Sequence, residues 1–176
     1  EYVPLGPFLG KSFATSISPW VVTMEALGAA HVRLPGQDPE PLPYLRGEPT
    51  ADGAGTAYGL DISLEVEWNG TVVARPQFRD MYWSPAQMLA HMTVNGASVR
   101  TGDLFGSGTI SGEEKDTRGS FLELSWSGTE PITLADGSQR TFLEDGDTVT
   151  LRAVAPGPDG AVIGLGECTG TVLAAR

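Results

Sequence analysis

Residues 60–78 read LDISLEVEWNGTVVARPQF, and they carry the clearest structural signal in the chain. Over the first half of this stretch apolar and polar side chains alternate, which is typical of a strand with one apolar and one acidic face. Asn69 and Gly70 follow, and both tolerate the positive φ that the central residues of a tight hairpin turn require. A second strand-like run continues to Phe78. The stretch therefore predicts an antiparallel hairpin.

The rest of the chain is turn-rich. Gly and Pro supply 23 and 13 of the 176 residues, which favours strands joined by many turns over a helical bundle. Further strands are predicted at 104–110, 121–126, 148–154 and 170–173. We therefore expect residues 1–176 to form one domain that is mainly β, a mixed β-sandwich or roll.

One main helix is predicted over residues 84–95. Ser84 can cap its first turn, Pro85 suits the first helical position, and Gln87 can complete a capping box. Residues 34–59, which include five prolines, are expected to form a long loop.

The charge balance excludes several classes of protein. The chain has 22 acidic and 11 basic residues, a net charge of -11, and so lacks the basic face that nucleic acids and anionic membranes attract. No apolar run approaches the roughly 18 residues of a membrane-spanning helix. A single cysteine excludes a disulfide framework, and only two histidines disfavour a histidine-rich metal site.

Charged residues in apolar surroundings are candidate site residues. Lys11 lies in the apolar run 8–13, where its ammonium needs either a simple ion pair or a carboxylate cluster or substrate oxyanion. Glu123, in the predicted strand 121–126, is either a buried functional carboxylate or an ordinary solvent-facing residue. The Gly-rich run 100–112 suits either an oxygen ligand near its backbone amides or a tight strand corner.

Several motifs together resemble one known family. They are the runs 2–13, 18–22, 38–39, 41–45, 81–83, 94–96, 102–104, 107–112 and 122–126. On these motifs the chain is similar to the fumarylacetoacetase (fumarylacetoacetate hydrolase) family over nearly its whole length. The Gly-rich motif is shared with related isomerases, hydratases and decarboxylases, whereas the lysine run and Leu122–Trp126 are more specific.

This resemblance implies a fold of the family's C-terminal domain type and a reaction. The expected activity is hydrolysis of the carbon–carbon bond of 4-fumarylacetoacetate to fumarate and acetoacetate, the last step of tyrosine and phenylalanine catabolism. A divalent cation, Mg²⁺ or Ca²⁺, a cytoplasmic location and a homodimer are also implied. The alternatives are another superfamily member, such as an acylpyruvate hydrolase or a 2-oxo-acid decarboxylase or isomerase, and a non-catalytic β-rich assembly domain.

The resemblance also implies roles for particular residues. Lys11 matches the active-site lysine, which would balance carboxylate charge near the metal and stabilise developing negative charge. Thr15 matches a threonine close to the metal, and Tyr2 and Thr109 match positions that contact the substrate. Glu123 matches the carboxylate that orients the catalytic histidine.

The family's catalytic histidine itself has no counterpart here. Neither His31 nor His91 falls at its position, and the family's substrate-binding arginine and metal-ligand carboxylates precede the segment that aligns with Tyr2. We therefore expect the chain to be the C-terminal half of the enzyme, incomplete by itself, with the upstream half as its partner.

Overall fold

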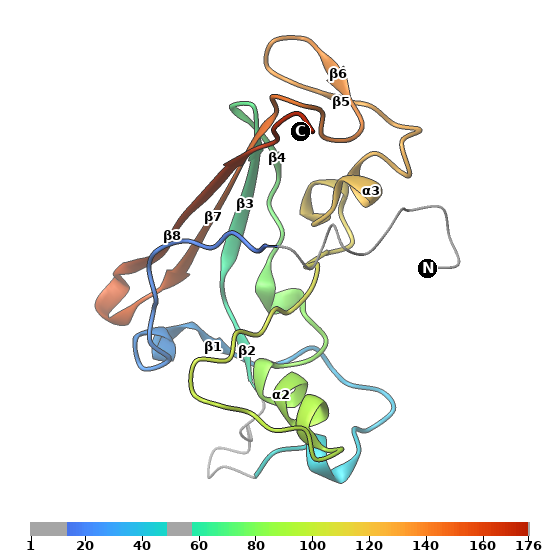
Figure 1. Cartoon of the computed structure of the whole chain (residues 1–176). Coiled ribbons are helices and arrows are strands. Elements are labelled where there is room, and N and C mark those ends of the chain that lie inside the picture. The colour runs from blue at the N-terminus through green and yellow to red at the C-terminus, as the bar shows by residue number, and fades with distance from the viewer. Residues whose placement is uncertain (1–13, 49–57, 176) are drawn as a thin grey trace.

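A four-stranded antiparallel sheet dominates the computed structural model, which describes residues 14–48 and 58–175 (Figure 1). The strands lie in the order β4-β3-β7-β8. Their bounds are β3 Ser63–Trp68, β4 Thr71–Ala74, β7 Thr148–Pro156 and β8 Val162–Thr171. The mainly-β fold expected from the sequence is confirmed.

The predicted hairpin forms the junction of β3 and β4. Trp68 pairs with Thr71, and the turn residues Asn69 and Gly70 have φ of 47° and 79°. Trp68 is fully buried. The strand predicted from Leu60 is nevertheless divided, because β2 (Gly59–Leu60) pairs with β1 (His31–Val32) outside the main sheet.

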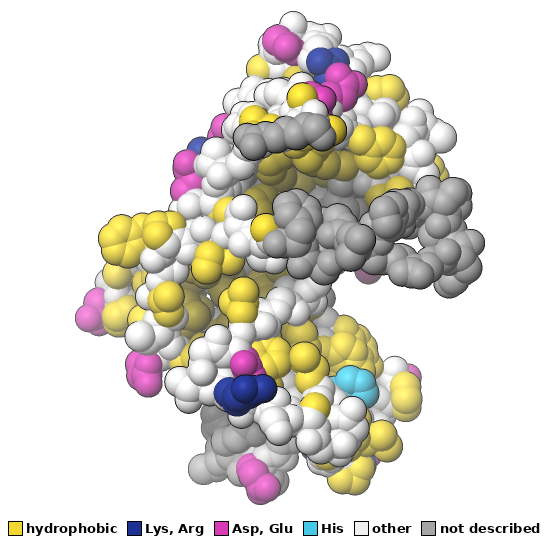
Figure 2. Space-filling model, in the orientation of Figure 1, with side chains coloured by type: hydrophobic (Ala, Val, Ile, Leu, Met, Phe, Trp, Pro, Cys, Tyr) yellow, Lys and Arg dark blue, Asp and Glu magenta, His cyan; other side chains and the backbone are white. Residues whose placement is uncertain are grey.

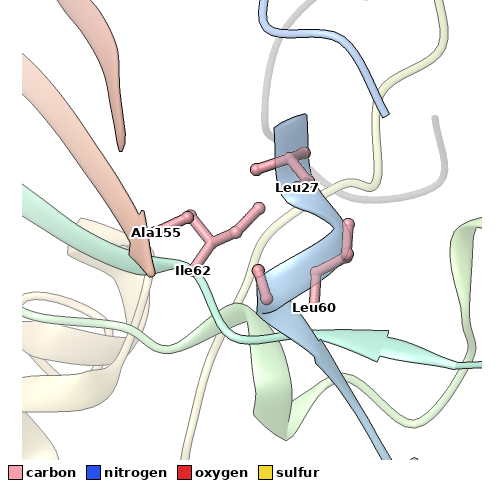
Figure 3. Close-up of a cluster of buried hydrophobic side chains, with 5 residues drawn as sticks. Leu27, Leu60, Ile62 and Ala155 are labelled. Carbon is pink, nitrogen blue, oxygen red and sulfur yellow. The ribbon is translucent and has the colours of Figure 1, made fainter. Parts of the chain in front are cut away.

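An apolar cluster joins this small sheet to the large one. It consists of Leu27, Ala30, Leu60, Ile62 and Ala155 (Figure 3). The first two residues come from the 3-10 helix η1 (Ala26–Ala30). Burial of each Leu or Ile side chain contributes about 1.5–3 kcal/mol, so this cluster holds the N-terminal segment against the sheet.

The main helix, α2 (Pro85–Thr93), is confirmed together with its capping box. The Ser84 hydroxyl accepts a hydrogen bond from the Gln87 backbone amide, and the Gln87 side chain accepts one from the Ser84 amide, both at 3.0 Å. Gln87 Nε2 also donates to the Leu45 carbonyl at 3.0 Å. This contact fixes the 3-10 helix η2 (Pro43–Leu45) in the Pro-rich loop against α2.

Two predicted strands are wrong. Residues 121–126 begin with the helical turn α3 (Phe121–Leu124), and 104–110 contain no strand. In the first, the Ser120 hydroxyl caps the turn, and Phe121 and Leu124 share one side of it, where they pack inward. In the second, Gly108 has φ of 79°, which interrupts extended backbone.

The remaining elements are short. They are η3 (Phe78–Asp80), η4 (Lys115–Thr117), η5 (Pro158–Gly160), β5 (Ile132–Thr133) and β6 (Gln139–Arg140). In the part of the chain that the structure describes, no helix has the length and apolar character needed to cross a bilayer.

Candidate active site

A hollow of about 650 Å³ lies where α3, the Gly-rich segment and the segment before α2 meet. It is lined by Asp80, Met81, Tyr82, Trp83, Thr109, Ser111, Ser120, Leu122 and Glu123. Figure 2 shows the surface indented beside the part of the molecule that carries α2. Thr109 and Glu123, which belong to separate sequence motifs, therefore line the same hollow.

Two side-chain hydrogen bonds hold the carboxylate of Glu123 in this hollow. The Ser111 hydroxyl donates to its Oε2 at 2.7 Å, and the Ser120 hydroxyl donates to the same oxygen at 2.8 Å. The side chain is half-buried. Among the described residues, Oε1 has no hydrogen-bond partner, so this oxygen can accept a proton donor from a ligand or another segment.

Glycine at position 119 allows the segments around Glu123 to come together. A Cβ there would clash with the Ile110 carbonyl oxygen and lie 3.1 Å from the Thr109 side chain. The Gly119 amide donates to the Ser111 hydroxyl at 3.0 Å. The Gly-rich run thus forms a close backbone contact that places Ser111 beside the carboxylate.

Of the other predicted site residues, the structure describes Thr15. Thr15 is exposed and does not line the Glu123 hollow. Lys11 and Tyr2 lie outside the described residues. The roles assigned to these residues stay predictions.

The two histidines lie in other surroundings. His91 contacts the Tyr44 hydroxyl through Nδ1 at 3.0 Å beside a separate pocket of about 220 Å³, and His31 stacks on Tyr58 with ring centroids 3.8 Å apart. Neither lines the Glu123 hollow. The expectation that neither is the catalytic histidine stays a prediction.

Sequence reasoning missed several residues of the hollow, and signals for some of them were present. Asp80 and Ser120 were not singled out, and Ser111 and Trp83 entered only as members of motifs. Ser120 and Glu123 have the Ser-x-x-Glu spacing that marks a helix N-terminus, so the sequence could have indicated both the turn and the contact.

The described residues do not supply a ligand set for a metal ion. Within residues 14–48 and 58–175, no group of three or more His, Cys, Asp or Glu side chains could hold one. Asp80 and Glu123 are the carboxylates that line the hollow. A divalent cation here would need further ligands from outside the described residues.

Comparison with known proteins identifies the family. A sequence model described as "Fumarylacetoacetate (FAA) hydrolase C-terminal" matches residues 1–173. The chain belongs to this family. The resemblance drawn from its motifs is thereby confirmed.

Similar members of the family carry the name fumarylacetoacetase. The chain is 49% identical to the protein of Arabidopsis thaliana, 50% to that of Homo sapiens and 52% to that of Emericella nidulans. These matches cover 98–99% of this chain but only 40–41% of each relative. The chain therefore spans about two fifths of the length of the relatives it matches.

Proposed function

We propose that this chain forms the C-terminal part of the active site of an enzyme that hydrolyses 4-fumarylacetoacetate to fumarate and acetoacetate. The observation that carries the proposal is Glu123, held by two serine hydroxyls at a hollow that also contains Thr109, in a chain about half identical to proteins named fumarylacetoacetase. On this proposal the chain acts in the last step of tyrosine and phenylalanine catabolism.

The reaction needs an activated water and a stabilised leaving group. Water adds its oxygen to the carbonyl carbon next to the bond that breaks, and the electrons of that bond leave with acetoacetate, which takes up a proton. Glu123 Oε1 would accept the imidazole N–H of a histidine supplied by the upstream part of the enzyme. That contact fixes the imidazole so that its other nitrogen can remove the proton from water.

The other residues would bind and compensate charge. Thr109 and Tyr2 would contact the substrate, and Lys11 would offset the negative charge of carboxylates and of the developing enolate. Thr15 would lie near the metal. When bound, Mg²⁺ or Ca²⁺ would polarise the substrate oxygens, but the roles given to the described residues do not depend on it.

The proposal also includes the assembly. The family resemblance suggests a homodimer in the cytoplasm in which each active site is completed by the upstream part of the protein. The oligomeric state is measured by light scattering on the protein expressed from the full reading frame that encodes this chain.

The test measures the loss of fumarylacetoacetate by that full-length protein with Mg²⁺ or Ca²⁺. We expect turnover in the wild type and a fall in kcat of about 10²- to 10⁴-fold in Glu123→Gln, the range for loss of acid–base assistance. Glu144→Gln, which removes a carboxylate paired with Arg140, serves as the control and should keep full activity.

Other outcomes distinguish the alternatives. Cleavage of acylpyruvates, or decarboxylation of 2-oxo acids, without loss of fumarylacetoacetate would indicate another member of the superfamily. A folded, metal-supplied protein that turns over none of these substrates would indicate a β-rich assembly domain.

A further inference from the structure

The hydrogen bonds to the Glu123 carboxylate are asymmetric. Both donors, Ser111 and Ser120, bind Oε2 at 2.7 and 2.8 Å, and among the described residues none binds Oε1. A carboxylate held in this way has one oxygen fixed by the protein and the other free to accept a proton donor in the hollow.

The direction of each serine proton is also fixed. The Ser111 hydroxyl oxygen accepts the Gly119 amide at 3.0 Å, and the Ser120 hydroxyl oxygen accepts the Glu123 amide at 3.3 Å. Because each hydroxyl has a single proton and its oxygen already receives a backbone N–H, that proton is directed to Oε2. Two backbone amides thus orient the carboxylate through two hydroxyl groups.

The two serines reach the carboxylate from different parts of the chain. Ser120 belongs to the turn that carries Glu123, whereas Ser111 is 12 residues away in the Gly-rich segment. A simple helix cap would need only Ser120. At α2 the corresponding cap, Ser84, accepts the Gln87 amide, and no carboxylate lies at the equivalent helix position.

We propose that Ser111 and Ser120 are positioning residues that hold the Glu123 carboxylate so that Oε1 faces its reaction partner. The inference rests on the proposed function, since that partner is the histidine or water of the hydrolysis. The serines touch neither substrate nor water in this account and act only through Glu123.

The experiment uses the full-length protein and compares kcat and KM of Ser111→Ala, Ser120→Ala and Ser120→Thr. The alanine variants should lower kcat about 10- to 100-fold, the cost of a misplaced catalytic group, with KM within about threefold of the wild type. Ser120→Thr keeps the hydroxyl and should retain kcat within about threefold. Ser84→Ala, which removes a helix cap away from Glu123, should lower the melting temperature without changing kcat.

Combination with Glu123→Ala shows whether the serines act through the carboxylate. In that background Ser111→Ala should change kcat less than about twofold. Wild-type kcat in both serine variants, or the same fold-loss with and without Glu123, would overturn the inference while leaving the hydrolase proposal intact.

Thermal unfolding separates this inference from the proposed function. If the wild type does not cleave fumarylacetoacetate, the proposed function fails, and the four proteins of the Ser111 and Glu123 cycle are compared by melting temperature. Non-additive losses would support the serine–carboxylate contact independently of any activity. Additive losses would overturn it.

Discussion

Gly119 is the residue on which the candidate site depends most directly for its shape. Its backbone lies against the Ile110 carbonyl, and its amide holds the Ser111 hydroxyl. Any side chain here must push the Gly-rich segment away from α3. The same movement would withdraw Ser111 from Glu123.

We therefore expect Gly119→Ala to lower both stability and activity. Forcing a methyl group into an occupied space costs about 1–3 kcal/mol. The free energy of unfolding, measured in urea, should fall by that amount, and kcat for the proposed reaction should fall with it. Gly170→Ala, at a position where a Cβ meets nothing within 4 Å, is the matched control. Equal stability of the two variants would contradict the steric argument.

Asp147 holds the ends of β3 and β7 together. Asn69 Nδ2 donates to its Oδ1 at 2.7 Å, and the Glu144 amide donates to its Oδ2 at 2.8 Å. Burial by itself would raise the pKa of Asp147, but the hydrogen bonds from Glu144 and Asn69 favour the charged form, and the pKa lies below its ordinary value. Because the folded state lowers this pKa, the stabilisation is present above the unfolded value and is lost as the pH falls through the folded value.

Asp147→Asn should therefore show a pH-dependent loss of stability. The amide presents a donor to Asn69 or to the Glu144 amide, so one contact is lost. The difference in unfolding free energy from the wild type should be constant between pH 7 and 5 and shrink below about pH 4, near the ordinary aspartate pKa. Asp159→Asn, at an exposed turn position, should show no such difference. If the difference in unfolding free energy stayed constant down to pH 3, the lowered pKa of Asp147 would not account for its contribution to stability.

At the scale of elements, Gln87 joins the main helix to the Pro-rich loop. Besides closing the capping box, its amide exchanges hydrogen bonds with the Gln37 side chain at 2.9 and 3.1 Å and donates to the Leu45 carbonyl. The side chain is buried. A single residue thus fixes both the start of α2 and the course of the loop across it.

Gln87→Ala should consequently cost more than the loss of the cap alone. Ser84→Ala removes only the cap and should lower the free energy of unfolding by about 1 kcal/mol. Gln87→Ala also leaves buried partners unpaired, so we expect about 2–3 kcal/mol. Urea titrations of the two variants make the comparison. If Gln87→Ala were no worse than Ser84→Ala, the contacts to the loop would contribute nothing.

Local signals explain which elements could be predicted. Asn69-Gly70 and the box of Ser84 and Gln87 depend on neighbouring residues only, and both form as predicted. Residues 121–126 fit an alternating pattern and a helical pattern equally well over so short a length. The helical turn is favoured by Ser120, which caps it, and by Trp68, whose ring centroid lies 4.5 Å from that of Phe121.

The candidate site was predictable only in part, because its contacts are not local. Glu123 is a candidate both from its apolar surroundings in the sequence and from the family resemblance, whereas Thr109 is named through the resemblance alone. The two residues line one hollow. Two features depend on segments that are distant in the sequence and close in space. Asp80 lines this hollow, and the Ile110 carbonyl leaves room only for glycine at position 119. Neither alternation nor helical spacing carries that information.

At the scale of the whole molecule, acidic residues outnumber basic ones, and one arginine on the main sheet contacts several of them. Arg152 on β7 binds Glu67 at 2.7 Å and Glu167 at 2.8 Å, and Glu65 lies 3.6 Å away. The hydrogen bonds with Glu67 and then Glu167 raise the pKa of Arg152 above its ordinary value. One guanidinium on β7 therefore links carboxylates on the two strands that flank it, β3 and β8.

Arg152→Met should destabilise the sheet in a way that salt relieves. In a chain of net charge -11 the variant leaves three carboxylates facing one another, and at low salt we expect the free energy of unfolding to fall by more than it does on loss of an isolated surface pair. Added NaCl to 1 M, where the screening length is about 3 Å, should remove most of this loss because the repulsion is screened. Arg46→Met, which breaks the single exposed pair with Glu40, should cost less than about 0.5 kcal/mol at any salt concentration. Urea titrations across salt decide, and a loss for Arg152→Met that is independent of salt would show that Arg152 acts through packing of its stem instead of its charge.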